Sequence, residues 1–222
     1  MCGRTTLTLD LAFMKDVLSL KHWEKEDYYF ARYNMAPTQE TPILLDDGAR
    51  RVKLMRWGLV PSWSKGISKE YQMINARAET VLEKPSFRRL VPRRRCVVLT
   101  DGFYEWKKGT RGKTPYYIHS PEGGLLPMAG LWDIRKDSRG GELFSYAIVT
   151  TEPKPEIAFI HNRMPVILEM STLDAWLQTE AFEVEEAVGL LKPYPGDLEA
   201  FPVSTFVNSP SNDSPKCIEP AS

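Results

Sequence analysis

The first residues of the chain bring two nucleophiles together. The sequence begins MCGR, with a cysteine directly after the initiator methionine. An initiator Met before a small residue is usually trimmed, and trimming Met1 would leave Cys2 with a free α-amine two carbons from its own thiol. Such a residue is suited to covalent chemistry by nucleophilic attack. The alternative is that Cys2 is an incidental residue in a frayed terminus.

A carboxylate in the middle of the chain is a candidate proton donor. In TDGFYEWKK, Glu105 stands between Tyr104 and Trp106, with Phe103 on its own side of the predicted strand. A carboxylate half-buried among aromatic rings has a raised pKa, as a proton donor at neutral pH needs. The competing interpretation is a solvated residue paired with a neighbouring lysine.

Two further stretches carry polar residues in unusual patterns. MINARAET places Asn75, Arg77 and Glu79 at alternating positions, which share one face of an extended segment. RYNMAPTQ places Asn34 ahead of Pro37. A structural alternative for both asparagines is that they satisfy the backbone of turns.

The stretch FIHNRMPVIL places His161 two residues before Arg163, ahead of an apolar strand. A histidine in this position can transfer protons, or it can simply be hydrogen-bonded in the core. The three cysteines, Cys2, Cys96 and Cys217, form no CxxC or Cys/His cluster. We therefore expect neither a metal site nor a disulfide framework.

Composition is that of one globular domain. The 222 residues are 42% apolar, 26% charged and 11% aromatic. Lys plus Arg equals Asp plus Glu, 29 each, so a globally basic nucleic-acid binder is not indicated, although a local basic patch is compatible with this balance. No apolar run approaches the roughly 18 residues of a membrane span, and no secretory leader is evident. We expect a cytoplasmic protein with reduced thiols and no membrane association.

The pattern of elements predicts an α+β fold. Short runs rich in β-branched and aromatic residues, separated by Gly, Pro and Asp, predict a barrel-like, mostly antiparallel sheet. These runs are TPILLDD, RRVKLMRWGLV, RRCVVLT, FYEWKK, TPYYIHS, PMAGLWDIR, ELFSYAIVTT and MPVILE. Peripheral helices are predicted for LDLAFMKDVLSL, for STLDAWL with Ser171 as N-cap, and for FEVEEAVGLLKP. Residues 209–222, rich in Ser and Pro, are expected to be loosely held or to lie as an extended strap on the body.

Taken together, these stretches resemble the SRAP (SOS response-associated peptidase) family. The resemblance runs nearly end to end over MCGR, RYNMAPTQ, RWGLVPSW, INARAET, CVVLTDGFYEWKK, IHNRMPVIL and FPVSTFVNSP. It implies a single domain over 1–222 with a positively lined cleft for single-stranded DNA that contains an abasic site. It also implies that mature Cys2 forms a stable thiazolidine crosslink with the DNA, without a cofactor.

The resemblance assigns roles by matching positions. It makes Glu105 the acid–base catalyst and His161 the residue beside the sugar hydroxyl, and it has Asn75 orient the reacting group by hydrogen bonds. It gives DNA-binding roles to six further residues: Arg4, Arg77 and Arg163 on phosphates, Asn34 and Pro37 in the pocket wall, and Trp63 as a wedge that stacks on bases. Some relatives have two adjacent tryptophans at the wedge, where this chain has one.

Two other functions stay open at this stage. One is a thiol peptidase, for self-processing or beyond, with Cys2 as nucleophile, His161 as base and Glu105 as its orienter. The other is a non-catalytic reader of modified bases or single strands, which would bind DNA without forming an adduct. We expect a monomer, associated with the nucleoid when it is bound to damaged DNA.

Overall fold

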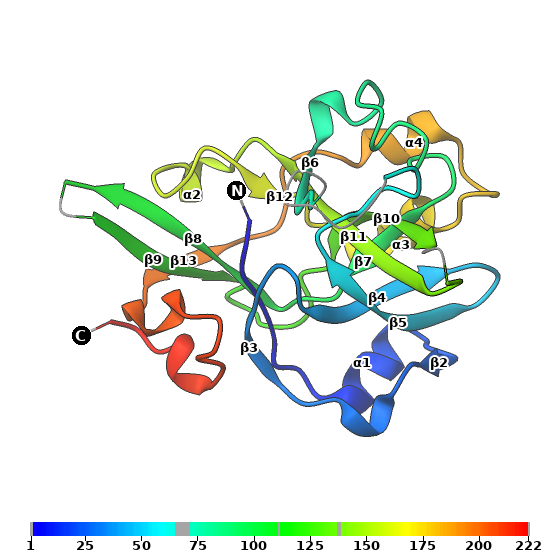
Figure 1. Cartoon of the computed structure of the whole chain (residues 1–222). Helices are drawn as coiled ribbons and strands as arrows, with labels where there is room; N and C mark the ends of the chain where they lie inside the picture. The colour runs from blue at the N-terminus through cyan, green and yellow to red at the C-terminus, as the bar shows by residue number, and fades with distance from the viewer. Residues whose placement is uncertain (1, 65–71, 111, 137–138, 222) are drawn as a thin grey trace.

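A closed barrel of five strands forms the centre of the protein (Figure 1). The computed structural model describes residues 2–64, 72–110, 112–136 and 139–221. The barrel strands are β4 (Glu40–Asp46), β5 (Arg50–Trp57), β7 (Arg95–Val98), β10 (Met128–Lys136) and β11 (Glu142–Thr151). Neighbouring strands are antiparallel except at the closure, where β11 pairs in parallel with β5. The predicted α+β fold on a barrel-like sheet is thus confirmed.

Alternation along the barrel strands separates two apolar clusters. Leu44 and Val97 face the helices, whereas their neighbours Ile43 and Val98 belong to a second cluster. Since successive side chains of a strand point to opposite faces, the second cluster fills the barrel interior. Tyr146 closes the interior with a hydrogen bond to Thr41, 2.7 Å between the two hydroxyl oxygens.

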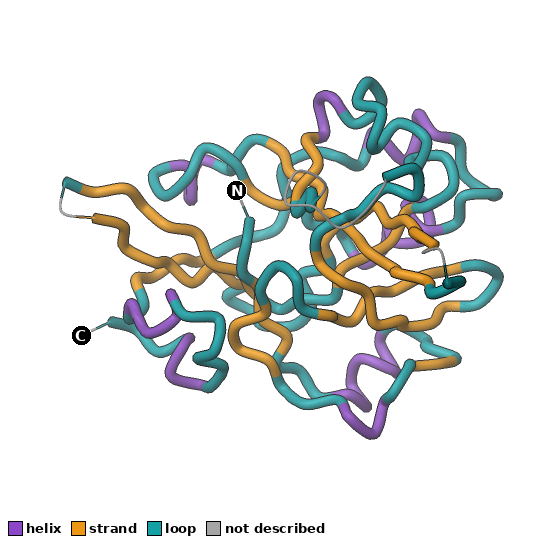
Figure 2. The backbone as a smooth tube through the Cα atoms, in the orientation of Figure 1, coloured by secondary structure: helices purple, strands orange, loops and turns teal. Residues whose placement is uncertain are grey.

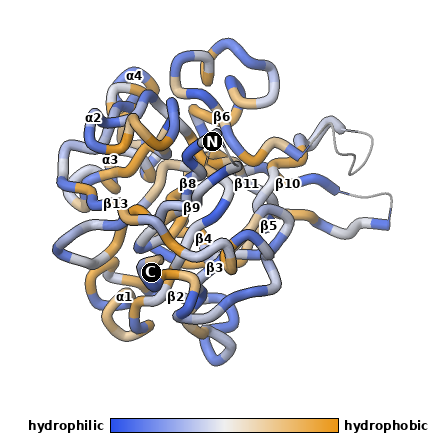
Figure 3. Tube along the Cα trace, turned by 90° about the vertical axis from the view of Figure 1, so that its left-hand side faces the viewer, coloured by the Kyte–Doolittle hydropathy of each residue, from blue (hydrophilic) through white to orange (hydrophobic). Residues whose placement is uncertain are grey.

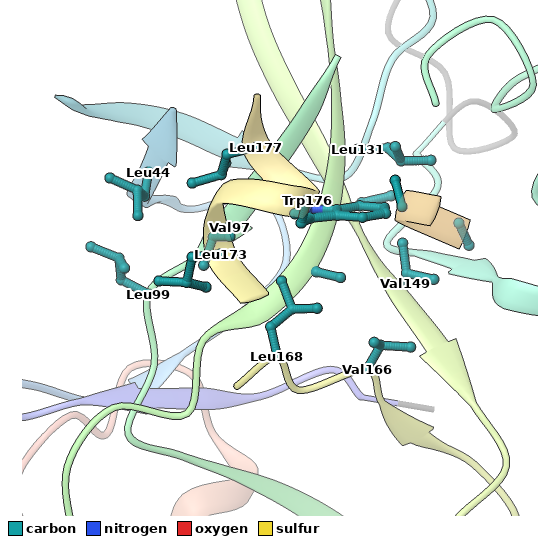
Figure 4. Close-up of a cluster of buried hydrophobic side chains, with 14 of the residues drawn as sticks. Leu44, Val97, Leu99, Leu131, Val149, Val166, Leu168, Leu173, Trp176 and Leu177 are labelled. Carbon is teal, nitrogen blue, oxygen red and sulfur yellow. The ribbon is translucent and has the colours of Figure 1, made fainter. Parts of the chain in front are cut away.

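Short helices cover the outer face of the barrel. They are α1 (Leu11–Val17), α3 (Leu173–Leu177) and α4 (Val184–Gly189). A further helix, α2 (Pro155–Ala158), instead packs Ile157 into the second cluster. Trp176 of α3 lies among the outer side chains in Figure 4, and its indole N–H donates to the carbonyl of Cys96 at 2.8 Å. The predicted N-cap at Ser171 is wrong, because a 3-10 turn over Met170–Thr172 precedes α3 and makes Thr172 the N-cap.

A second, antiparallel sheet packs beside the barrel. Its order is β13 (Glu199–Pro202), β9 (Gly112–His119), β8 (Gly102–Gly109), β1 (Thr5–Leu7) and β3 (Arg32–Met35). The β8–β9 hairpin extends away from the body, as the strand path in Figure 2 shows. The remaining elements are β2 (His22–Trp23), β6 (Asn75–Arg77), β12 (Met164–Pro165) and the 3-10 turns Glu26–Tyr28, Ala78–Thr80, Thr205–Asn208 and Pro215–Cys217.

The C-terminal segment is fastened to the second sheet. The backbone N–H of Tyr33 donates to Asp213 at 2.6 Å, and Arg32 forms an ion pair with the same carboxylate. Cys217 is fully buried, and the N–H of Ala221 donates to the carbonyl of Pro202 at 2.8 Å. Of the two expectations for residues 209–222, the structure thus has the strap on the body and not the loosely held tail, and contacts with residues far away in the sequence hold it. None of the helices in the described ranges is long and apolar enough to cross a membrane.

Candidate active site

The strand β1 fixes the position of the N-terminus. It lies between β3 and β8, with Thr5 opposite Met35 on one side and Phe103 on the other. The buried carboxylate of Asp101 adds two short bonds, 2.5 Å from the hydroxyl of Thr6 and 2.6 Å from the N–H of Thr8. A one-residue slip would turn every side chain of the strand to the other face, so this clamp determines which face Cys2 joins.

Cys2 lies where the barrel meets the second sheet. Its side chain is 0% exposed and packs in the cluster that also holds Phe103 and Ile148. The side-chain amide of Asn75 donates to the carbonyl of Cys2 at 2.8 Å. The other amide atom, Asn75 Oδ1, is buried and has no hydrogen-bond donor among the described residues. Asn75 therefore orients Cys2 and presents a buried acceptor beside it.

Glu105 is a buried carboxylate next to Cys2. It is 4% exposed in β8, and burial raises its pKa to about 7. Burial, and then the negative charge of Glu105, hold the pKa of the Cys2 thiol far above its usual value. The pairing of β1 with β8, with the N–H of Tyr104 donating to the carbonyl of Arg4 at 3.0 Å, brings the N-terminal residues alongside the part of β8 that carries Glu105. The raised pKa predicted for Glu105 is confirmed, and it leaves the carboxyl able both to donate and to accept a proton near neutral pH.

His161 follows α2 and is half-buried. Its Nδ1 accepts a hydrogen bond from the backbone N–H of Arg163 at 3.1 Å. A backbone N–H is always a donor, so the neutral ring carries its proton on Nε2. Burial, together with the positive charges of Lys108 and Lys113, lowers the pKa of His161. Both effects favour the neutral ring, whose tautomer presents a donor at Nε2.

The two predicted phosphate-binding arginines of this edge differ in their surroundings. Arg77 is exposed at the end of β6. Arg163 forms a bidentate ion pair with Glu79, at 2.7 and 3.0 Å, and also donates to the carbonyl of Thr150. The alternation of Asn75, Arg77 and Glu79 does not continue past the strand, because Glu79 lies in a 3-10 turn that directs it toward Arg163. Of the two arginines, Arg77 is thus the exposed one, and Arg163 is engaged by Glu79.

Arg4 and Asn34 hold the C-terminal strap in this structure. One terminal nitrogen of Arg4 donates to Asn34 Oδ1 at 2.7 Å and to the carbonyl of Val207 at 2.6 Å. Asn34 is fully buried, and its amide nitrogen donates to three carbonyls of the strap. The structure therefore shows the backbone-satisfying role for Asn34, and the DNA contacts of both residues stay predictions.

Pro37 and Trp63 lie in turns at the surface. Pro37 is half-buried in the turn Ala36–Gln39, in which Thr38 takes a positive φ of 77°. Trp63 is 57% exposed, which suits a side chain that stacks on bases. The segment after Ser64 lies outside the described residues until Gln72, as does Met1.

Comparison with known proteins identifies the family. Residues 1–210 match the family profile described as SOS response associated peptidase (SRAP). The chain belongs to the SRAP family. A relative from Bacillus subtilis (strain 168), named abasic site processing protein YoqW, is 39% identical and aligns over 99% of each chain. The Gallus gallus protein named abasic site processing protein HMCES is 36% identical, over 99% of this chain and 78% of its own.

A solved structure supports the same fold for this SRAP protein. The X-ray crystal structure of a protein from Bacteroides thetaiotaomicron matches it with a TM-score of 0.89 and 26% identity. The match covers 99% of this chain and 100% of the other. The two proteins therefore share their overall fold. In this chain Cys2 lies beside β6, to which Asn75 belongs, and Figure 3 shows this end of the chain from a second side.

Two further residues support the site of this SRAP protein, of which sequence reasoning missed Asp101 and singled out Glu79 for its alternating position. Asp101 holds the strand that carries Cys2, and Glu79 holds the fork of Arg163. The TDG stretch contained a signal for Asp101, since an acidic residue directly before a strand often bonds neighbouring backbone groups. No local signal distinguished a Glu79–Arg163 pair, because the two residues are 84 positions apart.

Proposed function

We propose that this SRAP protein binds single-stranded DNA at abasic sites and forms a covalent thiazolidine crosslink through Cys2, once per molecule. The observation that carries the proposal is the meeting of Cys2, Asn75 and Glu105 from three separate segments of the chain. The family relatives named for abasic site processing supply the substrate class. No cofactor is needed, because both nucleophiles belong to one residue and the electrophile belongs to the DNA.

The reaction requires two bonds to one carbon. An abasic site opens to an aldehyde, and the neutral α-amine of mature Cys2, with a reference pKa near ~8, adds to it. Loss of one water from the carbinolamine gives a Schiff base. The thiol then adds to the same carbon, and its proton passes to the nitrogen. Since the thiol is already tethered, ring closure has a large effective concentration, up to ~10⁵ M or more in well-oriented cases.

Three side chains assist these steps. Glu105, with a pKa of about 7, donates a proton for ring opening and for loss of water, and accepts one in return. His161 donates from Nε2 to an oxygen of the sugar, in keeping with its tautomer. Asn75 holds the Cys2 carbonyl, which keeps the adjacent amine and thiol directed at the aldehyde.

The protein acts as a monomer. It holds the DNA strand by ion pairs with phosphates and by stacking on bases. Arg77 and, after exchange of Glu79 for a phosphate, Arg163 bind the backbone, and Trp63 stacks on the bases at the lesion. Arg4, Asn34 and Pro37 shape the pocket wall, the first two through their hold on the strap. A few well-placed cations suffice for a short strand despite the net charge of zero.

Thiol peptidase chemistry fits the same residues less well. A Cys–His–Glu triad needs one ring nitrogen of His161 for the thiol and the other for Glu105. Here Nδ1 is occupied by the N–H of Arg163. The raised pKa of Cys2 also keeps the sulfur protonated, and the thiolate is the nucleophile in such enzymes. Self-processing at Met1 is compatible with crosslinking as a side activity.

A denaturing gel tests the proposal. The mature protein is incubated with a single-stranded oligonucleotide that carries one abasic site. We expect one shifted, heat-stable band with one protein per DNA, and no shifted band with undamaged DNA. Repeated turnover of a peptide panel without a shifted band would instead favour the peptidase.

Replacing Glu105 with glutamine is expected to slow crosslinking on bound DNA by ~10²-fold or somewhat less, because an aldehyde and an amine also react unaided. In the wild type the acid form of Glu105 is lost as pH rises through about 7, so the single-turnover rate falls above this pH. The rate of the variant does not show this fall. DNA affinity stays nearly unchanged.

The control for Glu105 is Glu24→Gln, which alters a partly buried carboxylate that accepts from the N–H of Leu54 at 2.9 Å, far from Cys2. It should leave rate and pH profile intact. If Glu105→Gln weakened DNA binding strongly but left the rate on bound DNA unchanged, Glu105 would belong to binding or folding instead of proton transfer.

Arg77→Ala and Arg163→Ala are each expected to weaken binding to any single strand. Each lost phosphate contact reduces the slope of log affinity against log salt by ~0.7. Arg51→Ala serves as control, since Arg51 pairs with Asp47 in the β4–β5 hairpin. For Arg163, an unchanged slope would assign its guanidinium to the Glu79 pair alone.

A further inference from the structure

An exposed aromatic ring stands close to His161 and has no role in the steps above. Phe159 directly follows α2, two residues before His161, and is 51% exposed. Its ring meets the ring of Tyr116 edge-on, with centroids 5.6 Å apart and an interplanar angle of 87°. Tyr116 lies directly opposite Glu105 in the β8–β9 hairpin, so both point to the same face. Phe159 is therefore a braced ring on the face of the hairpin that carries the proposed acid–base group.

A lysine of the hairpin contacts this ring. The ammonium of Lys107 lies 4.7 Å from the centre of the Phe159 ring, and the charges of Lys108 and Lys113 reach His161. Within the described ranges, none of these three lysines forms an ion pair with a carboxylate. The hairpin therefore presents uncompensated positive charge beside the ring.

The two faces of the hairpin divide these lysines. Lys107 shares the face of Glu105 and Tyr116, whereas Lys108 and Lys113 lie opposite each other on the other face. A ligand on the Phe159 ring therefore meets the charge of Lys107. A nucleic acid strand combines the two features that the surface selects for, a flat base for the ring and a phosphate for the lysine.

We propose that Phe159 and Lys107 form a subsite for a nucleotide that flanks the abasic site, with its base stacked on the Phe159 ring. The flexible side chain of Lys107 leaves the ring when the base arrives and binds the adjacent phosphate. This subsite extends the proposed function, on which it rests for the identity of the ligand. It gives the strand an anchor beyond the lesion itself, where no base is present to stack.

A double-mutant cycle tests the subsite without any covalent step. The DNA carries a tetrahydrofuran analogue, which has no aldehyde, and one neighbouring base at a time is removed on its 5′ or 3′ side. For the wild type, we expect one such removal to weaken equilibrium binding by about 5- to 50-fold. Phe159→Leu should lose a similar factor with intact DNA and nothing further when that base is removed.

Phe13→Leu is the matched control, because Phe13 of α1 is 45% exposed and no lysine of the described residues lies over its ring. It should behave as wild type. The subsite alone would be overturned if the wild type bound tightly and the effect of Phe159→Leu were the same with and without each neighbouring base. If the wild type did not bind the lesion-containing strand at all, the proposed function would fail with it.

Discussion

Replacing Cys2 with alanine is expected to abolish the heat-stable DNA–protein crosslink. The variant keeps an α-amine after Met1 removal, so it forms the Schiff base, but it has no thiol to close the ring. A Schiff base hydrolyses on heating, whereas a thiazolidine persists. The shifted band should therefore be absent from a denaturing gel, and borohydride added before heating should recover it by reducing the imine.

Cys217→Ala is the matched control for this prediction. Cys217 is also a fully buried cysteine, but it belongs to the strap and packs in a different cluster from Cys2. Its replacement should leave the band at wild-type intensity. A heat-stable band that persisted in Cys2→Ala without a reductant would contradict the thiazolidine mechanism. The other thiol in the cluster that holds Cys2 is that of Cys96, which lies in the barrel wall.

Retaining Met1, or adding a tag before Cys2, is expected to abolish stable crosslinking equally. In that form the Cys2 nitrogen is an amide, whose lone pair is delocalised into the carbonyl. The thiol survives and can add to the aldehyde, but only as a reversible hemithioacetal that cannot close into a thiazolidine. The gel with the abasic oligonucleotide should show no heat-stable band.

Two measurements make this second prediction decisive. Intact mass on the same sample establishes that the tag is still present, since self-processing would restore Cys2 as the N-terminus. A tag placed after Ser222 tests for an unspecific effect and should leave the crosslink unchanged. An uncleaved N-terminal tag with a normal rate of adduct formation would show that the amine is not used.

The sequence by itself determined which groups are available for chemistry. Cys2 has its two nucleophiles because of its position in the chain, and the environment of Glu105 followed from the aromatic residues around it on one strand. The barrel strands were predictable for a similar reason. Alternation of apolar residues accompanies burial of one face of a strand and a continuous apolar run accompanies burial of both, and each pattern is a local property of the sequence.

Only the tertiary structure decided which partner each polar group takes. Arg163 and Arg77 look alike in sequence, yet Glu79 occupies the fork of the first and leaves the second exposed. The apparently loose tail became a strap because Asn34 and Asp213 each satisfy backbone groups far away along the chain. The physical reason is that a hydrogen bond or ion pair depends on distances of a few Å between residues of any sequence separation. Those distances are reached only in the folded protein, in which β11 pairs with β5 to close the barrel and pairs with β6 to place it beside the N-terminus.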